Sequence, residues 1–433
     1  MAAELTIGTA GLLQDGVRLP AAAVQALVAG LAQRLEQGAR QRVALISDRA
    51  DAALVALLAC QRAGCDLLLW RQATPPDSPV WRELGVSALL DGELGLVELP
   101  LPRRAEAAGL VLLATSGTTG TPKVAMHRLD RLLGRVRSPR DAAAAQHDRV
   151  LLTYHPCSFA GLQVLLTALV SGAELLAVSR STVASLAAAA LAHRPTLCSG
   201  TPTFWRGFML ALGPQAASVP LRHITLGGEA VDQVTLDRLR QCFPAAGIVH
   251  IYASTEAGAL YAVRDGRAGF PRAWLDDGID GVSLRIRDGA LQVRSPRAMQ
   301  AYVAGAGASP IDADGWLSTG DLVEAEGDRV LFRGRVDSVI NVGGAKVRPE
   351  EIEAALLELP QVADVRAFAA RNPITGELVG VELVLAEGLR LDDVRPIIVA
   401  HARQRLGGYK VPRVLRQVTA LDASATGKKQ RGG

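Results

Sequence analysis

Residues 112–123 read Leu-Leu-Ala-Thr-Ser-Gly-Thr-Thr-Gly-Thr-Pro-Lys. A short apolar strand here runs into seven consecutive Thr, Ser or Gly residues, and Pro122 and Lys123 follow. Small residues let backbone amides approach phosphate oxygens, hydroxyl groups add donors, and a lysine adds positive charge. The stretch therefore predicts a phosphate-binding loop. The flanking strand and the Pro-Lys ending favour this interpretation over a plain surface turn, which a Ser/Thr/Gly run alone would indicate.

This loop is not a Walker-type P-loop. A Walker motif has Gly directly before its Lys and Ser or Thr directly after it. Lys123 instead stands between Pro122 and Val124. The sequence therefore predicts a phosphate site of another kind.

Strands and helices alternate on both sides of the loop. Apolar runs predict strands at residues 42–47, 66–70, 110–114, 150–154, 174–178 and 224–226, and helical patterns lie at residues 52–63, 162–171 and 181–192. Such alternation predicts an α/β fold, with helices covering both faces of a parallel sheet.

After about residue 280 the pattern changes to β-hairpins. Residues 282–287 and 290–294 alternate around Asp288-Gly289, and residues 322–324 and 329–333 flank Glu326-Gly-Asp328. A helix with proline and acidic residues at its positive end is predicted from residue 349. We therefore expect a large N-terminal domain, residues 1–336, with layered α/β subdomains and a β-rich subdomain. A small α+β C-terminal domain, residues 337–433, follows.

Composition and charge narrow the class of protein. Of the 433 residues, 49% are hydrophobic and 21% are charged, as is ordinary for a soluble globular chain. A net charge of +4 without a basic block gives no support for nucleic-acid binding. We find no signal peptide and no apolar run long enough to span a bilayer. The five cysteines have no CxxC spacing, so we expect reduced thiols and a cytoplasmic location, with no membrane partner.

Residues 115–123 also carry a resemblance to a known family. They match Thr-Ser-Gly-Ser/Thr-Thr-Gly-x-Pro-Lys, the phosphate loop of the acyl-adenylate-forming superfamily, which includes acyl- and aryl-CoA synthetases, peptide-synthetase adenylation domains and luciferases. Further motifs in the expected order extend the resemblance over residues 110–431, and the region upstream is shorter than is usual. The resemblance implies that the ATP phosphates are bound by the following residues: Thr115, Ser116, Gly117, Thr118, Thr119, Gly120 and Lys123.

Two further motifs resemble the nucleotide site of that family. The turn Gly227-Gly-Glu-Ala230 is similar to the adenine-contacting turn, which implies adenine contacts at Gly228, Glu229 and Ala230. The segment Tyr252-Ala-Ser-Thr-Glu256 resembles the aromatic-Gly-x-Thr-Glu motif. By that resemblance Tyr252, Ala253 and Ser254 border the nucleotide, with Tyr252 stacked on adenine. Thr255 touches the α-phosphate, and Glu256 binds Mg²⁺, a hard cation for which a carboxylate is a suitable ligand.

The C-terminal motifs complete the resemblance. In Trp316-Leu-Ser-Thr-Gly-Asp321 the last residue is implied to accept both ribose hydroxyls, and Arg335 to contact the nucleotide. Asp337 is implied to be the hinge between the domains. Gly343 and Gly344 are implied to let a pantetheine arm pass close to the backbone. Alignment on Thr-Gly-Lys makes Lys428 the catalytic lysine, acting with Thr255 and Glu256.

The resemblance implies an acid–thiol ligase. Such an enzyme uses ATP and Mg²⁺ to convert a carboxylic acid to an acyl-adenylate, and passes the acyl group to CoA or to the pantetheine of an acyl carrier protein. Phe159, Gly161 and Ala253 are implied to line the acid pocket. A methyl group at Ala253, where the family has Gly, together with Phe204 and Trp205, favours an aromatic or short-chain acid.

Two alternatives remain open. A stand-alone adenylation enzyme for an amino acid would usually carry an aspartate in the segment that pairs with the α-ammonium group. Residues 154–163 contain no carboxylate, which favours an acid without an α-amine. A catalytically degenerate nucleotide-binding homologue would lack Glu256, Asp321 or Lys428, but all three are present.

Overall fold

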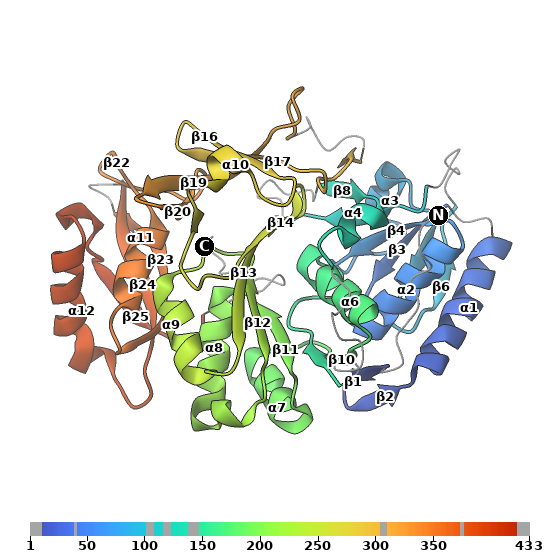
Figure 1. Ribbon diagram of the computed structural model, residues 1–433, viewed down its shortest axis with the longest axis horizontal. Coiled ribbons are helices and arrows are strands. Elements are labelled where there is room, and N and C mark those ends of the chain that lie inside the picture. The colour runs from blue at the N-terminus through green and yellow to red at the C-terminus, as the bar shows by residue number, and fades with distance from the viewer. Residues whose placement is uncertain are drawn as a thin grey trace.

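The computed structural model describes residues 11–38, 41–100, 108–115, 123–136, 147–303, 310–372 and 376–421. Within these residues the chain forms four sheets. Figure 1 shows two of them in the blue-to-green part of the chain, a hairpin sheet above them, and a C-terminal unit in orange and red at one end. The mixed α/β fold predicted from the sequence is thereby confirmed.

The N-terminal sheet has the strand order β18-β8-β7-β4-β3-β5-β6. Its strands are β3 (Arg42–Ile46), β4 (Asp66–Trp70), β5 (Ala88–Leu90), β6 (Leu96–Glu98), β7 (Val111–Ala114), β8 (Val124–His127) and β18 (Ala301–Tyr302). Strands β7, β4, β3 and β5 run parallel, so their carboxyl ends lie at the same edge. The predicted phosphate loop begins at this edge, directly after β7.

The central sheet has the order β14-β13-β12-β11-β9-β10-β1-β2. Its strands are β1 (Leu12–Gln14), β2 (Val17–Leu19), β9 (Arg149–Leu151), β10 (Glu174–Ala177), β11 (Leu197–Gly200), β12 (His223–Gly227), β13 (Gly247–Ser254) and β14 (Gly258–Val263). All strands from β13 to β1 are parallel, whereas β14 and β2 close the two edges as antiparallel partners.

Helices form layers on and between these sheets. Helices α2 (Ala50–Arg62) and α6 (Phe159–Ser171) share one core with the inner faces of both sheets, and α1 (Ala21–Gln37) packs against the same core. Every residue of α2 from Ala50 to Cys60 is buried, because its many alanines let the helix fit between the two sheets. The outer face of the central sheet is covered by α7 (Val183–His193), α8 (Pro202–Leu212), η1 (Gly213–Ser218) and α9 (Gln233–Cys242).

The outer face of the N-terminal sheet has its own smaller core. Helix α3 (Pro79–Leu84) contributes Trp81, whose ring meets that of Trp70 edge to face at 5.5 Å between centroids. The short helix α4 (Leu129–Leu133) follows β8. Among the described helices, none combines the length and the hydropathy that a bilayer-spanning helix requires.

The hairpin sheet has the order β15-β20-β19-β17-β16 and packs on the β13–β14 hairpin. It consists of β15 (Phe270–Pro271), β16 (Ser283–Arg287), β17 (Ala290–Arg294), β19 (Leu317–Glu326) and β20 (Arg329–Arg335), with the one-turn helix α10 (Trp274–Asp277). Both hairpins predicted from the turn sequences are present, at β16–β17 and β19–β20.

The C-terminal unit has a separate core. Its elements are β21 (Ile340–Val342), β22 (Ala345–Val347), α11 (Pro349–Leu357), β23 (Val362–Asn372), β24 (Gly376–Leu385), α12 (Leu391–Arg405), η2 (Gly408–Lys410) and β25 (Val414–Gln417). Strand β23 lies against α8, so this unit docks on the outer face of the central layer. The predicted domain boundary after residue 336 falls just before β21 and stays a prediction.

Capping residues account for most differences between the predicted and observed helices. Ser158 accepts from the Gly161 N–H, so α6 begins at Phe159 and not at residue 162. Thr182 and Ser185 form a capping box, which delays the start of α7 to Val183. The strand predicted over residues 150–154 ends at Leu151, because the chain then turns toward the start of α6.

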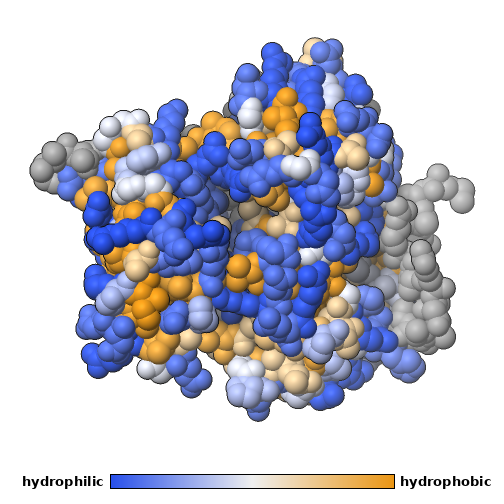
Figure 2. Space-filling model, turned by 60° about the vertical axis from the view of Figure 1, so that its left-hand side comes forward, coloured by the Kyte–Doolittle hydropathy of each residue, from blue (hydrophilic) through white to orange (hydrophobic). Residues whose placement is uncertain are grey.

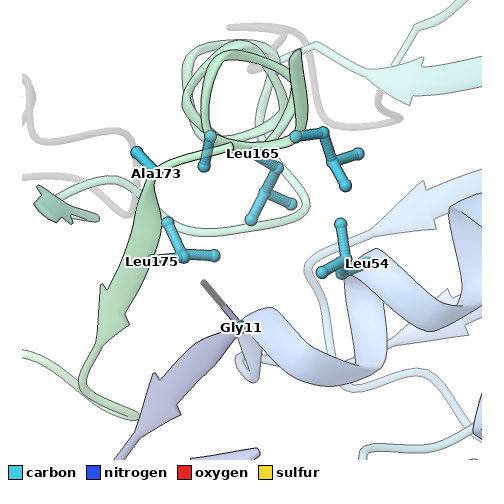
Figure 3. Close-up of a pocket in the computed structure, with 7 residues that line it drawn as sticks. Gly11, Leu54, Leu165, Ala173 and Leu175 are labelled. Atoms are coloured by element: carbon cyan, nitrogen blue, oxygen red, sulfur yellow. The ribbon is translucent and has the colours of Figure 1, made fainter. Parts of the chain in front are cut away.

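Two cavities lie in the N-terminal part, away from the predicted motifs. Figure 3 shows one of about 20 Å³ between α2, α6 and β10, where Leu54, Leu165 and Leu175 give it an apolar lining. A cavity of this size has room for about one water molecule, so it is a gap in the packing of the core. A hollow of about 330 Å³ is lined by residues of β1, β2, α1, α2 and the turn before β6.

Candidate active site

The predicted nucleotide motifs follow the carboxyl ends of parallel strands. Thr115 follows β7, Gly228 follows β12 and Thr255 follows β13. In open α/β sheets, ligands bind outside the carboxyl ends of the strands. Three motifs that are distant in sequence therefore stand at positions suited to a common ligand.

The base of the predicted phosphate loop is a tight antiparallel pair. The Thr115 N–H donates to the Lys123 carbonyl at 2.7 Å, and β7 pairs with β8 up to Ala114 and Val124. The two residues that flank the loop, Thr115 and Lys123, are therefore direct neighbours at the edge of the sheet. The other predicted phosphate-binding residues lie outside the described residues: Ser116, Gly117, Thr118, Thr119 and Gly120.

Tyr302 joins Lys123 to Glu256. The pairing of β18 with β8 brings the Tyr302 ring to 5.4 Å from the Lys123 ammonium, a cation–π distance. The Tyr302 hydroxyl donates to Glu256 Oε1 at 3.0 Å. Burial and the Glu256 carboxylate raise the pKa of Tyr302, so the phenol stays protonated and keeps donating. Tyr302 was not predicted from the sequence, since its role depends on the pairing of two distant segments.

Glu256 suits the metal role that the resemblance implies. It stands in the tight turn between β13 and β14, and its backbone carbonyl accepts from the Met299 N–H at 2.8 Å. Among the described residues, no three His, Cys, Asp or Glu side chains gather as a complete metal cage. Mg²⁺ is commonly bound by one or two carboxylates together with substrate phosphates and waters. A lone carboxylate beside a phosphate loop fits that donor set.

Tyr252, Asp321 and Arg335 form one hydrogen-bonded cluster. The Tyr252 hydroxyl donates to Asp321 Oδ2, and Arg335 Nη1 donates to Oδ1 at 3.0 Å. Burial and the Asp321 carboxylate raise the pKa of Tyr252, which keeps its hydroxyl a donor. The Tyr252 ring lies 5.0 Å from that of Phe332 and 5.4 Å from that of Tyr261. The structure thus brings the predicted adenine-stacking and ribose-binding residues together on an aromatic platform.

The predicted adenine turn is anchored by α8. Glu229 Oε2 accepts from the Thr203 N–H at 3.1 Å and from its hydroxyl at 2.7 Å. Gly228 has φ +84°, a left-handed conformation that glycine adopts without strain, and Ala230 is exposed. The Glu229 side chain therefore fixes the turn to α8, and the backbone of the turn stays available to a ligand.

His127 connects the phosphate strand to the β13–β14 turn. Its Nε2–H donates to the Thr255 carbonyl at 2.7 Å, and its side chain is fully buried. Burial lowers the pKa of His127 to about 4, so the ring is neutral at pH 7. Ser254 steadies the same turn by accepting from the Ala257 N–H at 3.0 Å. His127 was also missed by the sequence analysis.

The residues predicted for the acid pocket lie near this turn. Phe159, half-buried at the start of α6, has its ring 6.0 Å from that of His127, and Ala253 is half-buried at a β-bulge in β13. Gly161 has a structural reason to be glycine, because an added Cβ would lie 2.1 Å from the His155 carbonyl oxygen. Its part in the pocket stays a prediction.

Phe204 and Trp205 belong to the core. Trp205 is fully buried, meets the aromatic rings of α8 edge to face, and donates from Nε1 to the Thr225 carbonyl at 3.0 Å. Phe204 is 7% exposed and packs in the same cluster. The sequence argument that these two side chains shorten the acid pocket therefore loses its support.

The residues implied for the hinge and for the pantetheine path lie beyond β20. Asp337 is exposed and accepts from Arg335 Nε at 3.0 Å. Gly343 and Gly344 form the two-residue turn of the β21–β22 hairpin, and both have positive φ. An added Cβ on either would meet open space, so the tip of the hairpin is accessible. Lys428 lies outside the described residues.

Figure 2 shows the molecule turned so that the side of the C-terminal unit in Figure 1 comes toward the viewer. A hollow near the middle of this face has a largely hydrophilic rim, with paler and more hydrophobic residues at its floor. Ligand sites commonly combine a concave, partly apolar surface with a few polar groups.

Comparison with solved structures identifies the fold. The anthranilate CoA ligase AuaEII, in complex with anthranoyl-AMP, superposes with a TM-score of 0.80 over 98% of this chain and 93% of its own, at 17% identity. The amide bond synthetase McbA from Marinactinospora thermotolerans gives a TM-score of 0.74 over 98% and 96%, at 21% identity. The fold, with its large N-terminal part and smaller C-terminal part, is that of these enzymes.

Curated relatives are named as CoA ligases. The 3-[(3aS,4S,7aS)-7a-methyl-1,5-dioxo-octahydro-1H-inden-4-yl]propanoyl:CoA ligase of Rhodococcus jostii is 29% identical over 73% of this chain and 63% of its own length. The 2-succinylbenzoate–CoA ligase of Bacillus velezensis is 27% identical, over 74% and 67%, and the feruloyl-CoA synthase of Amycolatopsis is 28% identical, over 74% and 68%. The matched part of this chain thus spans about two thirds of each relative.

Family profiles agree with the resemblance drawn from the motifs. The profile described as AMP-binding enzyme matches residues 74–299, more than half of the chain. The profile described as AMP-binding enzyme C-terminal domain matches residues 351–428. The chain therefore belongs to the AMP-binding enzyme family.

Proposed function

We propose that the protein is an acid–thiol ligase, which activates a carboxylic acid with ATP to an acyl-adenylate and then transfers the acyl group to a thiol. The observation that carries this proposal is the arrangement around the β13–β14 hairpin. On one side the hairpin holds Tyr252 against Asp321, and at its turn it holds Glu256 beside Tyr302 and Lys123. These groups follow the order of the parts of a bound nucleotide. The Tyr252 ring corresponds to adenine and the Asp321 carboxylate to ribose. The Glu256 carboxylate corresponds to Mg²⁺, and the Lys123 ammonium group to the phosphates.

The first step must bring together two anions, a carboxylate and the α-phosphate of ATP. Positioning and electrostatic stabilisation supply most of the catalysis in reactions of this kind. Lys123 and the loop of residues 115–120 bind the terminal phosphates in this proposal. Thr255 contacts the α-phosphate, and Lys428 bridges it to the carboxylate. Glu256 would hold Mg²⁺, which neutralises phosphate charge when it is bound.

The nucleoside is held by the remaining motif residues. Tyr252 stacks on adenine beside the turn of Gly228, Glu229 and Ala230, and Ala253 and Ser254 line the way to the α-phosphate. Asp321 accepts from the ribose hydroxyls, because a carboxylate oxygen has room for more than one donor. Arg335 keeps that carboxylate oriented.

The second step needs a thiol at the acyl carbon. We propose that the C-terminal unit turns about Asp337, so that Lys428 leaves and the tip at Gly343 and Gly344 approaches the site. The open space around these two glycines leaves room for a pantetheine arm. CoA is favoured over a carrier protein as the source of the thiol, because the relatives compared above are named as CoA ligases.

The acid is proposed to be aromatic or short. Phe159 and Ala253 support a compact pocket, whereas Phe204 and Trp205 no longer do. Among the relatives, the names succinylbenzoate, ferulate and sulfoacetate describe acids of this size. Gly161 remains part of the proposed pocket through its place at the start of α6.

The test is ATP–pyrophosphate exchange across a panel of benzoates, cinnamates, short-chain acids, long-chain acids and amino acids. Exchange with benzoates or short acids is the expected result. Exchange with amino acids alone would identify a stand-alone adenylation enzyme. No exchange with any acid, in protein that still binds ATP, would identify a nucleotide-binding homologue without activity. Product analysis with CoA and with a pantetheinylated carrier protein then identifies the thiol.

A further inference from the structure

Arg71 stands beside the start of the phosphate loop. It directly follows β4, which pairs in parallel with β7 through Leu69 and Leu113. This register brings Arg71 alongside the first residues after β7. Its Nη2 lies 3.5 Å from the Ala114 carbonyl oxygen, a long and weak hydrogen bond.

The positive charge of Arg71 has no protein counter-ion in the part of the chain that the structure describes. Its Nε is buried and has no acceptor. Burial lowers the pKa of Arg71, which reflects the cost of holding this charge away from water. Arg71 is half-buried, and two fully buried arginines of the chain are paired: Arg42 lies 2.9 Å from Asp66, and Arg206 lies 2.7 Å from Asp364. Because charges shielded from water in proteins are nearly always paired, the half-buried guanidinium of Arg71, with its shielded Nε, is suited to an anion supplied by a ligand.

A second donor lies in the neighbouring loop. His155 precedes α6, and its Nδ1 accepts from the Cys157 N–H at 3.1 Å. Burial, together with the charge of Arg71, lowers the pKa of His155 to about 4, so the ring is neutral. A neutral ring that accepts at Nδ1 carries its proton on Nε2, and this N–H has no partner among the described residues. Asp48, the acidic residue near this loop, is paired with Arg180 at 3.7 Å.

We propose that Arg71, with His155 beside it, binds an oxyanion at the carboxyl edge of the N-terminal sheet. The anion is either the terminal phosphate part of the nucleotide, which leaves as pyrophosphate, or a second acidic group on the carboxylic acid. Both are planar or tetrahedral groups of charged oxygens that a guanidinium binds with two parallel hydrogen bonds. The choice of these two candidate ligands rests on the proposed function, whereas the site itself rests on the surroundings of Arg71.

The test compares Arg71→Gln and Arg71→Lys with Arg62→Gln, a loss of charge at an exposed arginine on α2. Calorimetry measures the affinity for magnesium pyrophosphate. Exchange kinetics measure KM for phthalate against benzoate and for succinate against propionate. A charge-assisted contact predicts a loss of roughly ten- to a hundred-fold in Arg71→Gln. A smaller loss is expected in Arg71→Lys, and no change in Arg62→Gln.

The two sources of the anion give different results. A loss of pyrophosphate affinity assigns the site to the nucleotide. Unchanged pyrophosphate affinity, with KM raised for the doubly acidic acids alone, assigns it to the substrate. If neither quantity changes in folded Arg71→Gln, the site does not exist. Should that variant fail to fold, wild-type affinities in Arg71→Lys, where the bidentate contact is lost, would equally overturn the proposal.

The site and the proposed function can fail separately. Wild-type protein without exchange activity, but with pyrophosphate binding that depends on Arg71, would refute the ligase function and retain the site. Full exchange activity of the wild type, with pyrophosphate affinity and KM unchanged in Arg71→Gln, would refute the site alone. Thermal unfolding of the ligand-free protein adds an independent readout: Arg71→Gln should unfold no earlier than the wild type, because an uncompensated charge is removed. A clear fall in its Tm would instead mark Arg71 as a structural residue.

Discussion

Arg206 on α8 donates from Nε to Asp364 Oδ1 on β23 at 2.7 Å, and both residues are only 6% exposed. The pair joins the central layer to the C-terminal unit. Arg206 also contacts Asp232 at 3.3 Å and the Thr235 hydroxyl at 3.0 Å. Burial opposes its charge, but Asp364, Asp232 and Glu229 outweigh this and raise the pKa of Arg206. In the proposed domain movement this pair has to separate, so it stabilises the arrangement seen here.

Replacing Arg206 by Met should destabilise the protein. Asp364 then stays buried without its cation, and breaking a buried pair in this way costs about 3–5 kcal/mol. Urea denaturation of the single variants and of Arg206→Met with Asp364→Leu forms a double-mutant cycle. The double variant should recover most of the loss, because no buried charge is left unpaired at Asp364. A double variant as unstable as the sum of both single variants would show that the two residues do not interact.

His127 should make the stability of the protein depend on pH. Its pKa is about 4 in the folded protein, below its ordinary value of 6.5, so the proton binds preferentially to the unfolded chain. The stability that depends on neutral His127 is complete above about pH 6.5 and is lost as the pH falls toward 4. Between pH 7 and pH 5 the loss from this residue is about 2 kcal/mol.

The matching variant is His127→Gln, whose amide N–H can still donate to the Thr255 carbonyl. Urea denaturation at pH 7 and pH 5 should show about 2 kcal/mol less acid destabilisation in the variant than in the wild type. Equal pH dependence in both proteins would mean that His127 does not titrate as a buried group.

Local patterns predicted much of the fold. The strand at residues 66–70 and the start of the helix at Pro349 agree with the structure, because an apolar run and a proline followed by acids are signals within the segment itself. The observed starts of α6 and α7 differ from the predicted ones, because Ser158 and Thr182 cap these helices at other positions than the apolar pattern indicates.

The site was only partly predictable. Tyr252 and Asp321 were predicted from their motifs, and the structure brings them into contact. Tyr302 and His127 carry no local signal, because each acts through the pairing of segments far apart in the chain. Trp205 shows the opposite error: a bulky side chain near a motif suggests a pocket, but composition cannot tell which face of a sheet it covers.

Removing the Tyr302 hydroxyl should weaken the use of Mg-ATP. Tyr302→Phe loses the hydrogen bond to Glu256, and a hydrogen bond to a charged group contributes about 1.5–3 kcal/mol. Because Tyr302 is half-buried, we expect the lower end of that range, an increase of roughly ten-fold in KM for ATP in the exchange assay. Tyr409→Phe, at a tyrosine that is 50% exposed, is the control. An unchanged KM in Tyr302→Phe would separate Tyr302 from the metal site.

Replacing Asp321 by Ala should weaken nucleotide binding. The change removes the proposed ribose acceptor and also releases Tyr252 and Arg335, which both donate to it. Calorimetry should show a loss of roughly ten- to a hundred-fold in ATP affinity. Tyr252→Phe removes one of those donors and keeps the acceptor, so its loss should be smaller. ATP affinity equal to the wild type in Asp321→Ala would mean that ribose binds elsewhere.

Substitutions at Lys428 and Gly344 should impair different half-reactions. If Lys428 acts only in adenylation, Lys428→Ala abolishes ATP–pyrophosphate exchange but largely spares thioester formation from pre-made acyl-adenylate. Lys429→Ala, a change of the neighbouring lysine, should affect neither step. Gly344→Trp should have the opposite effect, by filling the open space at the tip of the β21–β22 hairpin that the pantetheine arm is proposed to use.

Gly344 also has φ +89°, so any side chain there adds backbone strain. Gly344→Ala carries that strain without the bulk of an indole ring and is therefore the matched control. Thioester formation should be lost in the Trp variant and mostly kept in the Ala variant, with exchange intact in both. Equal defects in thioester formation in the Ala and Trp variants would mean that the strained turn conformation causes the loss, and not the bulk of the indole ring. Equal loss of both half-reactions in folded Lys428→Ala would contradict the rotation of the C-terminal unit, because a residue that leaves after adenylation cannot serve the second step.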